Sequence, residues 1–217
     1  MVHNEATSGQ TSADTADTRA VFSAMTESFL TTLTCVADDK WEMPALGVWS
    51  VRELAGHASR ALRTLASACA TPAPQRDLVG ATQYFVQAAQ ETTRENVAER
   101  GKQAGTSLGP DPVTEARRLA ETALTAMENL PDDALVQTFA GGMCLSDYLE
   151  TRVFELVLHT FDLQAALQIE LSVPGEAERV VLHVLAELAA QDGKAVPVLR
   201  ALTGRAALPD RFNLLGV

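Results

Sequence analysis

The sequence lacks several features that would point to particular classes of protein. None of its apolar stretches approaches the ~18 uninterrupted residues of a membrane-spanning helix, and its first residues, Met1–Ser8, lack the charged and apolar regions of a signal peptide. It has no basic run of the kind that follows a nucleic-acid backbone, and its net charge is −11. We therefore expect a cytoplasmic protein with no membrane or nucleic-acid partner.

Cysteine and aromatic residues are also scarce. Cys35, Cys69 and Cys144 are odd in number, far apart and in no Cys-x-x-Cys spacing, so neither a disulfide framework nor a structural zinc site is indicated. We expect each cysteine to be a small buried hydrophobic side chain. Aromatic residues make up only 5% of the chain whereas alanine and leucine dominate, a composition that favours helices.

The 217 residues are enough for one domain with a full hydrophobic core. We expect residues 1–16, rich in Thr, Ser, Ala and Asp, to be a disordered tail and residues 17–217 to form a single domain. Apolar residues at three- and four-residue steps predict an all-α fold, with helices over about 17–38, 50–70, 81–102, 111–130, 146–167, 174–191 and 195–203. Ser50 and Glu53 have the spacing of a capping box at the start of the second helix.

The predicted helix over residues 146–167 is apolar on nearly every side. Its polar exceptions follow one face at steps of three, four and three residues: Arg152, Glu155, His159 and Asp162. A helix that is apolar all round is normally buried, where unpaired charges are costly. Either Arg152 pairs with Glu155 and Asp162 in an internal network, or Glu155 and His159 supply two ligands to one divalent metal ion.

A catalytic metal usually takes three protein ligands, so the second interpretation needs one more. His183 lies among apolar residues of the helix after Pro174, and we expect it to be a core or boundary histidine. His57 lies at the margin of the apolar face of the second helix. Gly56 beside it would let another helix or a ligand approach closely. The residues alone leave open whether His57 is a ligand.

Two motifs together resemble a known family. Residues 49–57, Trp-Ser-Val-Arg-Glu-Leu-Ala-Gly-His, are similar to a Trp-x-Val-x-(Asp/Glu)-Leu-x-x-His segment, and residues 152–163 to an Arg-x-x-Glu-x-x-x-His-x-x-Asp-Leu segment. Both segments are typical of the mycothiol-dependent maleylpyruvate isomerase N-terminal family in the DinB-like superfamily. Residues 199–213 look like the end of its short members, so the resemblance extends over nearly the whole chain. It implies a DinB-like four-helix bundle with additional short helices.

The same resemblance implies a metal site and a cosubstrate. It identifies His57, Glu155 and His159 as ligands of a divalent metal, zinc in the first place and nickel or iron otherwise, and mycothiol as the thiol that reacts at the metal. Arg152 and Asp162 would not bind the metal themselves but would contact or neutralise these ligands. We further expect Tyr148 to line the cofactor pocket together with the loop at residues 141–142, where two glycines give the backbone freedom.

The resemblance favours a metal-dependent thiol S-transferase, in which a metal-activated thiolate attacks an electrophilic small molecule or is transferred to it. The isomerase itself has a further C-terminal domain that contributes an arginine, and this sequence ends at Val217, too soon to contain it; Arg205 and Arg211 are not equivalent to that residue. Cis–trans isomerisation and metal-assisted hydrolysis are alternatives. A third is a non-enzymatic helical binding or regulatory protein with a structural polar network. Both a monomer and a homodimer are compatible with the sequence.

Overall fold

The computed structural model describes residues 17–91 and 93–215, so the tail predicted over residues 1–16 lies outside the described part. Helices account for most of this part, and the all-α prediction is confirmed. The elements are α1 (Thr18–Thr34), a 3-10 helix η1 (Asp38–Lys40), α2 (Val51–Cys69), α3 (Gly80–Glu91), α4 (Arg94–Ser107), α5 (Pro112–Glu128), β1 (Leu135–Thr138), β2 (Gly141–Cys144), α6 (Leu145–Leu167), α7 (Gly175–Gln191) and α8 (Ala195–Leu202).

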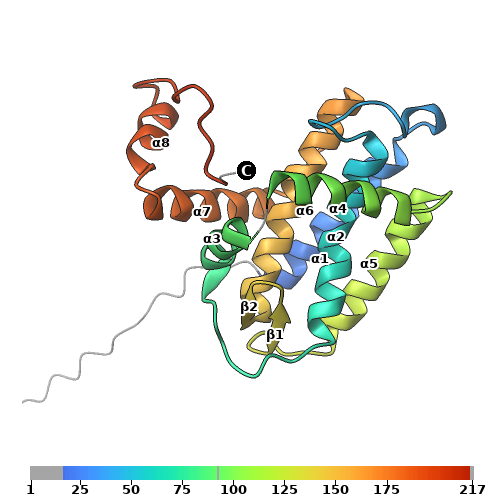
Figure 1. Ribbon diagram of the computed structural model, residues 1–217, viewed down its shortest axis with the longest axis horizontal. Helices are drawn as coiled ribbons and strands as arrows, with labels where there is room; N and C mark the ends of the chain where they lie inside the picture. The colour runs from blue at the N-terminus through green and yellow to red at the C-terminus, as the bar shows by residue number, and fades with distance from the viewer. Residues whose placement is uncertain (1–16, 92, 216–217) are drawn as a thin grey trace, which may run out of the picture.

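Four long helices, α1, α2, α5 and α6, form a bundle, and α4 lies across α2 on its outside (Figure 1). The bundle interior is filled by fully buried side chains such as Phe29 of α1, Leu62 of α2 and Val153 of α6. Helix α2 begins with the predicted capping box: the Ser50 side chain accepts from the backbone N–H of Glu53, and the Glu53 side chain accepts from the N–H of Ser50. This cap fixes where α2 starts and therefore which face it turns inward.

Glycines allow α4 to cross α2 at close range. A Cβ at Gly56 would lie 2.2 Å from the backbone nitrogen of Gly105, a distance that no side chain tolerates. A Cβ at Gly101 would likewise lie 2.4 Å from the Trp49 ring, which occupies that space and donates its Nε1–H to the Ala98 carbonyl at 2.9 Å. The close approach expected at Gly56 is therefore observed, and its occupant is another helix.

The single helix predicted over residues 81–102 is wrong, because the chain forms α3 and α4 instead. Thr93 has extended backbone angles, φ −99° and ψ 157°, and its side chain accepts a hydrogen bond from the backbone N–H of Asn96. It thus begins a new helix as an N-cap. Helix α4 then continues past Gly101 to Ser107, where Gly101 packs against the Trp49 ring and Gly105 against the backbone of α2.

The least helical interval, residues 132–145, contains a β-hairpin that the sequence pattern did not predict. Strands β1 and β2 pair in antiparallel fashion, with Leu135 opposite Cys144 and Thr138 opposite Gly141. Gly142 packs so closely on the preceding loop that a Cβ there would lie 2.1 Å from the Gln75 carbonyl oxygen. The glycines therefore serve hairpin packing.

Helix α7 packs on α6 through one face only, and α8 lies beyond it, away from the bundle (Figure 1). His183 points from the other face of α7 and is exposed, so the expected core or boundary position is wrong.

Cys35 is also exposed, because it follows the end of α1, whereas Cys69 and Cys144 are partly buried. No helix in the described ranges combines the length and apolarity that a membrane span needs.

Candidate active site

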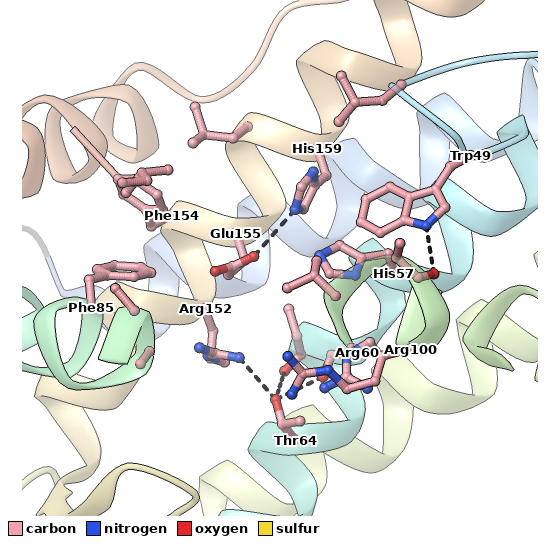
Figure 2. Close-up of a pocket in the computed structure, with 18 of the residues that line it drawn as sticks. Trp49, His57, Arg60, Thr64, Phe85, Arg100, Arg152, Phe154, Glu155 and His159 are labelled. Carbon is pink, nitrogen blue, oxygen red and sulfur yellow. Dashed lines mark hydrogen bonds and ion pairs between the residues drawn. The ribbon is translucent and has the colours of Figure 1, made fainter. Parts of the chain in front are cut away.

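A cavity of about 850 Å³ opens between α2, α3, α4 and α6. This is large enough for a small organic molecule, since ligand pockets commonly span about 300–1,000 Å³. One wall carries aromatic and aliphatic side chains, among them Phe85, Phe154 and Leu158. Opposite them lie Trp49, His57 and arginine side chains (Figure 2). The cavity thus combines an apolar wall with a polar one.

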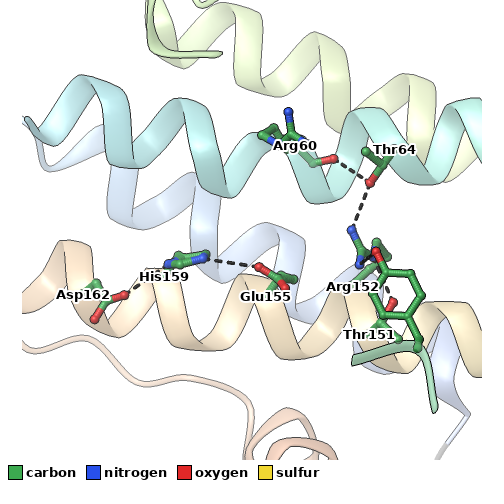
Figure 3. Close-up of polar contacts among 8 residues, drawn as sticks. Arg60, Thr64, Thr151, Arg152, Glu155, His159 and Asp162 are labelled. Carbon is green, nitrogen blue, oxygen red and sulfur yellow. Dashed lines mark hydrogen bonds and ion pairs between the residues drawn. The ribbon is translucent and has the colours of Figure 1, made fainter. Parts of the chain in front are cut away.

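The polar stripe predicted on α6 faces α2 across this cavity (Figure 3). His159 donates or accepts at both ring nitrogens: Nε2 lies 3.3 Å from Glu155 Oε2, and Nδ1 lies 3.1 Å from Asp162 Oδ2. His57 approaches from α2, and its ring centroid is 4.7 Å from that of His159, edge to face. The fold thus brings His57 together with Glu155 and His159, which come about a hundred residues later in the sequence.

These three side chains fit a divalent metal ion. Each offers one ligand atom, and the three atoms lie within 4.8 Å of one another. Two imidazoles and one carboxylate are a ligand set used by catalytic zinc, with a further position left for water or substrate. In the described part of the structure, the buried Nδ1 of His57 has no hydrogen-bond partner. Because buried polar atoms are nearly always satisfied, such an atom beside two further ligand groups suits a bound cation.

The pKa values of the three groups differ strongly. Burial alone would lower the pKa of His159, but its hydrogen bonds to Asp162 and Glu155 outweigh this and raise the pKa to about 9. Burial would raise the pKa of Glu155, but the hydrogen bond and charge of His159 and the charge of Arg152 lower it to about 2. Burial, and then the charge of His159, lower the pKa of His57 to about 3. At neutral pH without metal, His57 is uncharged and His159 is an imidazolium between two carboxylates.

Trp49 holds the His57 ring from the other side. The two ring centroids are 4.4 Å apart with an interplanar angle of 31°. The indole is itself held by its hydrogen bond to the Ala98 carbonyl and by close packing against Gly101. It therefore limits the rotation of the His57 imidazole. Trp49 is buried, and it also lines the cavity.

Arg152 is buried, but it makes no ion pair with Glu155 or Asp162 within the described ranges. Its guanidinium donates instead to hydroxyl oxygens: Tyr84 Oη at 2.9 Å, Thr64 Oγ1 at 3.0 Å and Thr151 Oγ1 at 3.0 Å. The network in which Arg152 pairs directly with these carboxylates is thus not formed. Arg152 acts on Glu155 through its charge alone.

Tyr148 does not line the cavity, contrary to expectation. It lies one turn before Arg152 on α6 and is buried, with the Arg152 guanidinium 4.6 Å from its ring centroid. The arginine therefore separates Tyr148 from the cavity. Gly141 and Gly142 are also absent from the lining, and the hairpin contributes Phe139 from the turn between its strands.

Sequence reasoning missed Arg60 and Arg100, which line the cavity close to the three candidate ligands (Figure 2). A signal for Arg60 was present, because it stands three residues after His57 and so shares its helical face. No comparable signal marks Arg100. Its position depends on the crossing of α4 over α2.

Comparisons with known proteins agree with the fold and the motifs. Residues 22–164 match the family described as mycothiol maleylpyruvate isomerase N-terminal domain, a stretch that includes both motifs but not α7 or α8. The crystal structure of the mycothiol-dependent maleylpyruvate isomerase is similar to this chain, with a TM-score of 0.55 and 18% sequence identity over 79% of this chain and 68% of that one. At this identity the likeness shows the shared DinB-like fold. No curated protein matches the sequence. The match over residues 22–164 shows that the chain belongs to the mycothiol maleylpyruvate isomerase N-terminal domain family.

Proposed function

We propose that the protein is a metal-dependent and mycothiol-dependent enzyme that joins the thiol to an electrophilic small molecule. The observation that carries the proposal is the meeting of His57, Glu155 and His159 at the wall of a cavity large enough for a small organic molecule. Membership of a family named for mycothiol chemistry supports the choice of thiol.

The metal site we propose consists of His57, Glu155 and His159. A divalent metal bound there, zinc in the first place, would lower the pKa of a thiol so that the reactive thiolate exists at neutral pH. Asp162 accepts from Nδ1 of His159, which keeps the proton on that nitrogen and leaves Nε2 turned toward Glu155. Trp49 keeps the His57 ring in place by stacking on it.

In the proposed transfer, the thiol of mycothiol loses its proton to solvent and its sulfur forms a bond to the electrophilic carbon. If that carbon bears a leaving group, the group departs with the electron pair of its bond. If the carbon belongs to an activated double bond, the neighbouring carbon takes up a proton. The apolar wall of Phe85, Phe154 and Leu158 lowers the access of water that would compete with the thiol.

A cis–trans isomerisation is the second candidate, because the family and the similar solved structure both carry the name of an isomerase. It uses the same first step: sulfur adds to one carbon of a double bond, the resulting single bond rotates, and the sulfur leaves with its electron pair to restore the double bond. The thiol is then regenerated, so the two candidates differ in whether thiol is consumed.

The test is to incubate the zinc-loaded protein with mycothiol and an activated aryl chloride, and in parallel with a cis-configured unsaturated dicarbonyl compound. Mass spectrometry follows the conjugate and chromatography follows the isomers. We expect conjugate formation to fall by about 100-fold or more in Glu155→Gln, because even the loss of a residue that only supports a metal ligand typically costs about 10–100-fold, and to persist in Glu150→Gln on the same helix. Trans product without loss of thiol would establish the isomerase instead. A metal-loaded protein that does neither contradicts the proposal.

A further inference from the structure

Arg60 of α2 and Arg100 of α4 lie on the same wall of the cavity, beside the three candidate metal ligands (Figure 2). Arg60 is one turn after His57, so it projects from the same face of α2. Arg100 comes from the crossing helix, and its Nε donates to the Asn96 carbonyl at 3.2 Å within α4. The close contact between Gly56 and Gly105 fixes the two helices against each other and hence the two arginines.

These two guanidinium groups have no anionic partner in the described part of the chain. Neither forms an ion pair or donates to a carboxylate there. The pKa of Arg60 is lowered, first by burial and then by the positive charges of Arg100 and Arg152, which together outweigh the opposite effect of the Glu155 charge. Of the two carboxylates that line the cavity, Glu155 is held by His159, and Glu95 is exposed.

Partly buried like charges that form no ion pair raise the free energy of the folded protein, because both desolvation and mutual repulsion oppose them. Guanidinium groups in such a place offer several N–H donors that match the two oxygens of a carboxylate. The facing wall has a different chemistry, since Phe85, Phe154 and Leu158 are apolar. A ligand that suits both walls has one anionic end and one apolar body.

We propose that Arg60 and Arg100 bind the carboxylate of an amphipathic electrophilic substrate whose aromatic or aliphatic body lies against the wall of Phe85 and Phe154. This assignment rests on the proposed function for the identity of the reaction, and it adds the chemical class of the electrophile. Arg152 also lines the cavity, but three of its five N–H groups already donate to hydroxyl oxygens, so we do not assign it to the binding pair. It adds positive charge to the same cavity.

The same donors could instead bind neutral oxygen atoms of a ligand, so the test compares charged and neutral forms of one unreactive probe. The dissociation constants of 4-nitrobenzoate and 4-nitrobenzamide are measured by titration calorimetry, with the zinc-loaded protein and after chelation, in the absence of thiol. We expect the carboxylate to bind about tenfold more tightly or better, equivalent to ~1.4 kcal/mol, in both preparations.

In the Arg60→Gln/Arg100→Gln double variant the preference should fall to within about twofold, and it should persist in Arg63→Gln, an exposed arginine on α2 outside the cavity. Circular dichroism verifies folding. We expect Arg60→Gln to melt no lower than the wild type, because it removes a repelled charge. If the double variant does not fold, the single Arg100→Gln variant provides the same comparison.

Equal affinities for the two probes in the wild type would overturn the assignment. A preference that survives in the double variant, or that appears only with zinc, would also overturn it. Because no thiol is present, the result is independent of the proposed function: carboxylate preference without thiol transfer leaves this inference standing and removes the proposed reaction. Thiol transfer without carboxylate preference leaves the proposed reaction standing and removes this inference.

Discussion

At the scale of single residues, the protonation of His159 determines the net charge of the metal-free site near neutral pH. Its hydrogen bonds to Glu155 and Asp162 raise its pKa from 6.5 to about 9, whereas burial lowers the pKa of His57 from 6.5 to about 3. Without metal, the folded protein therefore holds the His159 proton more tightly than the unfolded chain does. That stabilisation is fully present below pH 6.5 and is lost as the pH rises toward 9.

His57 acts in the opposite direction, because the unfolded chain takes up a proton below pH 6.5 that the folded protein refuses. The two histidines together predict that the metal-free protein is most stable near pH 6.5. The measurement is the melting temperature of chelator-treated protein between about pH 5 and pH 9. His159→Gln should lose the decline on the alkaline side, and the exposed His183→Gln should keep it. A melting temperature that rises steadily across this range in the wild type contradicts the assignment.

How far single site residues can be predicted depends on where their neighbours come from. The spacing of Glu155, His159 and Asp162 is local to one helix, so it could be read directly, and the observed contacts are those between residues three and four apart. The position of Tyr148 could not be predicted in this way, because it depends on which side of Arg152 faces the cavity. The position of Arg100 at the cavity could not be predicted either, because it is determined by the packing of α4 on α2.

At the scale of elements, the crossing of α4 over α2 positions one wall of the cavity. A Cβ at Gly56 would collide with the backbone of Gly105, which cannot rotate away as a side chain could. We expect Gly56→Ala to destabilise the protein by about 2 kcal/mol or more, since overpacking of this kind usually costs about 1–3 kcal/mol. Chemical denaturation measures it.

The matched control is Gly175→Ala at the start of α7, where an added Cβ meets nothing within 4 Å. This variant should be as stable as the wild type. Because α4 must move to accommodate the methyl group, Gly56→Ala should also weaken whatever binds at Arg100 and Trp49. Wild-type stability of Gly56→Ala would show that the two helices are less closely fixed than the structure has them.

Helices whose ends carry a local signal were predictable, and the others were not. Ser50 and Glu53 mark the start of α2 with a reciprocal cap that depends on no other part of the chain. The start of α4 depends on Thr93, which acts as an N-cap but could also have continued a polar helix. The sequence pattern therefore predicted one helix where the chain forms α3 and α4. The hairpin was missed because its short strands gain their order from pairing with each other and from the loop near Gln75.

At the scale of the whole molecule, the bundle of α1, α2, α5 and α6 serves to hold two distant segments face to face. His57 and the pair Glu155 and His159 are supplied by adjacent helices of the bundle, α2 and α6 (Figure 2). The bundle was predictable from helical periodicity together with the two motifs, which supplied the order and spacing of the elements. The place of α8 away from the bundle was not, because its apolar residues, such as Leu199, are exposed.

The central claim is that this arrangement binds one divalent metal ion per chain, and elemental analysis of the purified protein tests it most directly. The wild type is compared with His57→Ala, Glu155→Gln and His159→Ala, each with folding verified by circular dichroism, and with His183→Ala as a control outside the cavity. We expect about one metal ion per chain in the wild type and the control, and loss of that metal in the three site variants. A wild type that contains no metal and cannot be reconstituted with zinc, or site variants that retain it, would contradict the account.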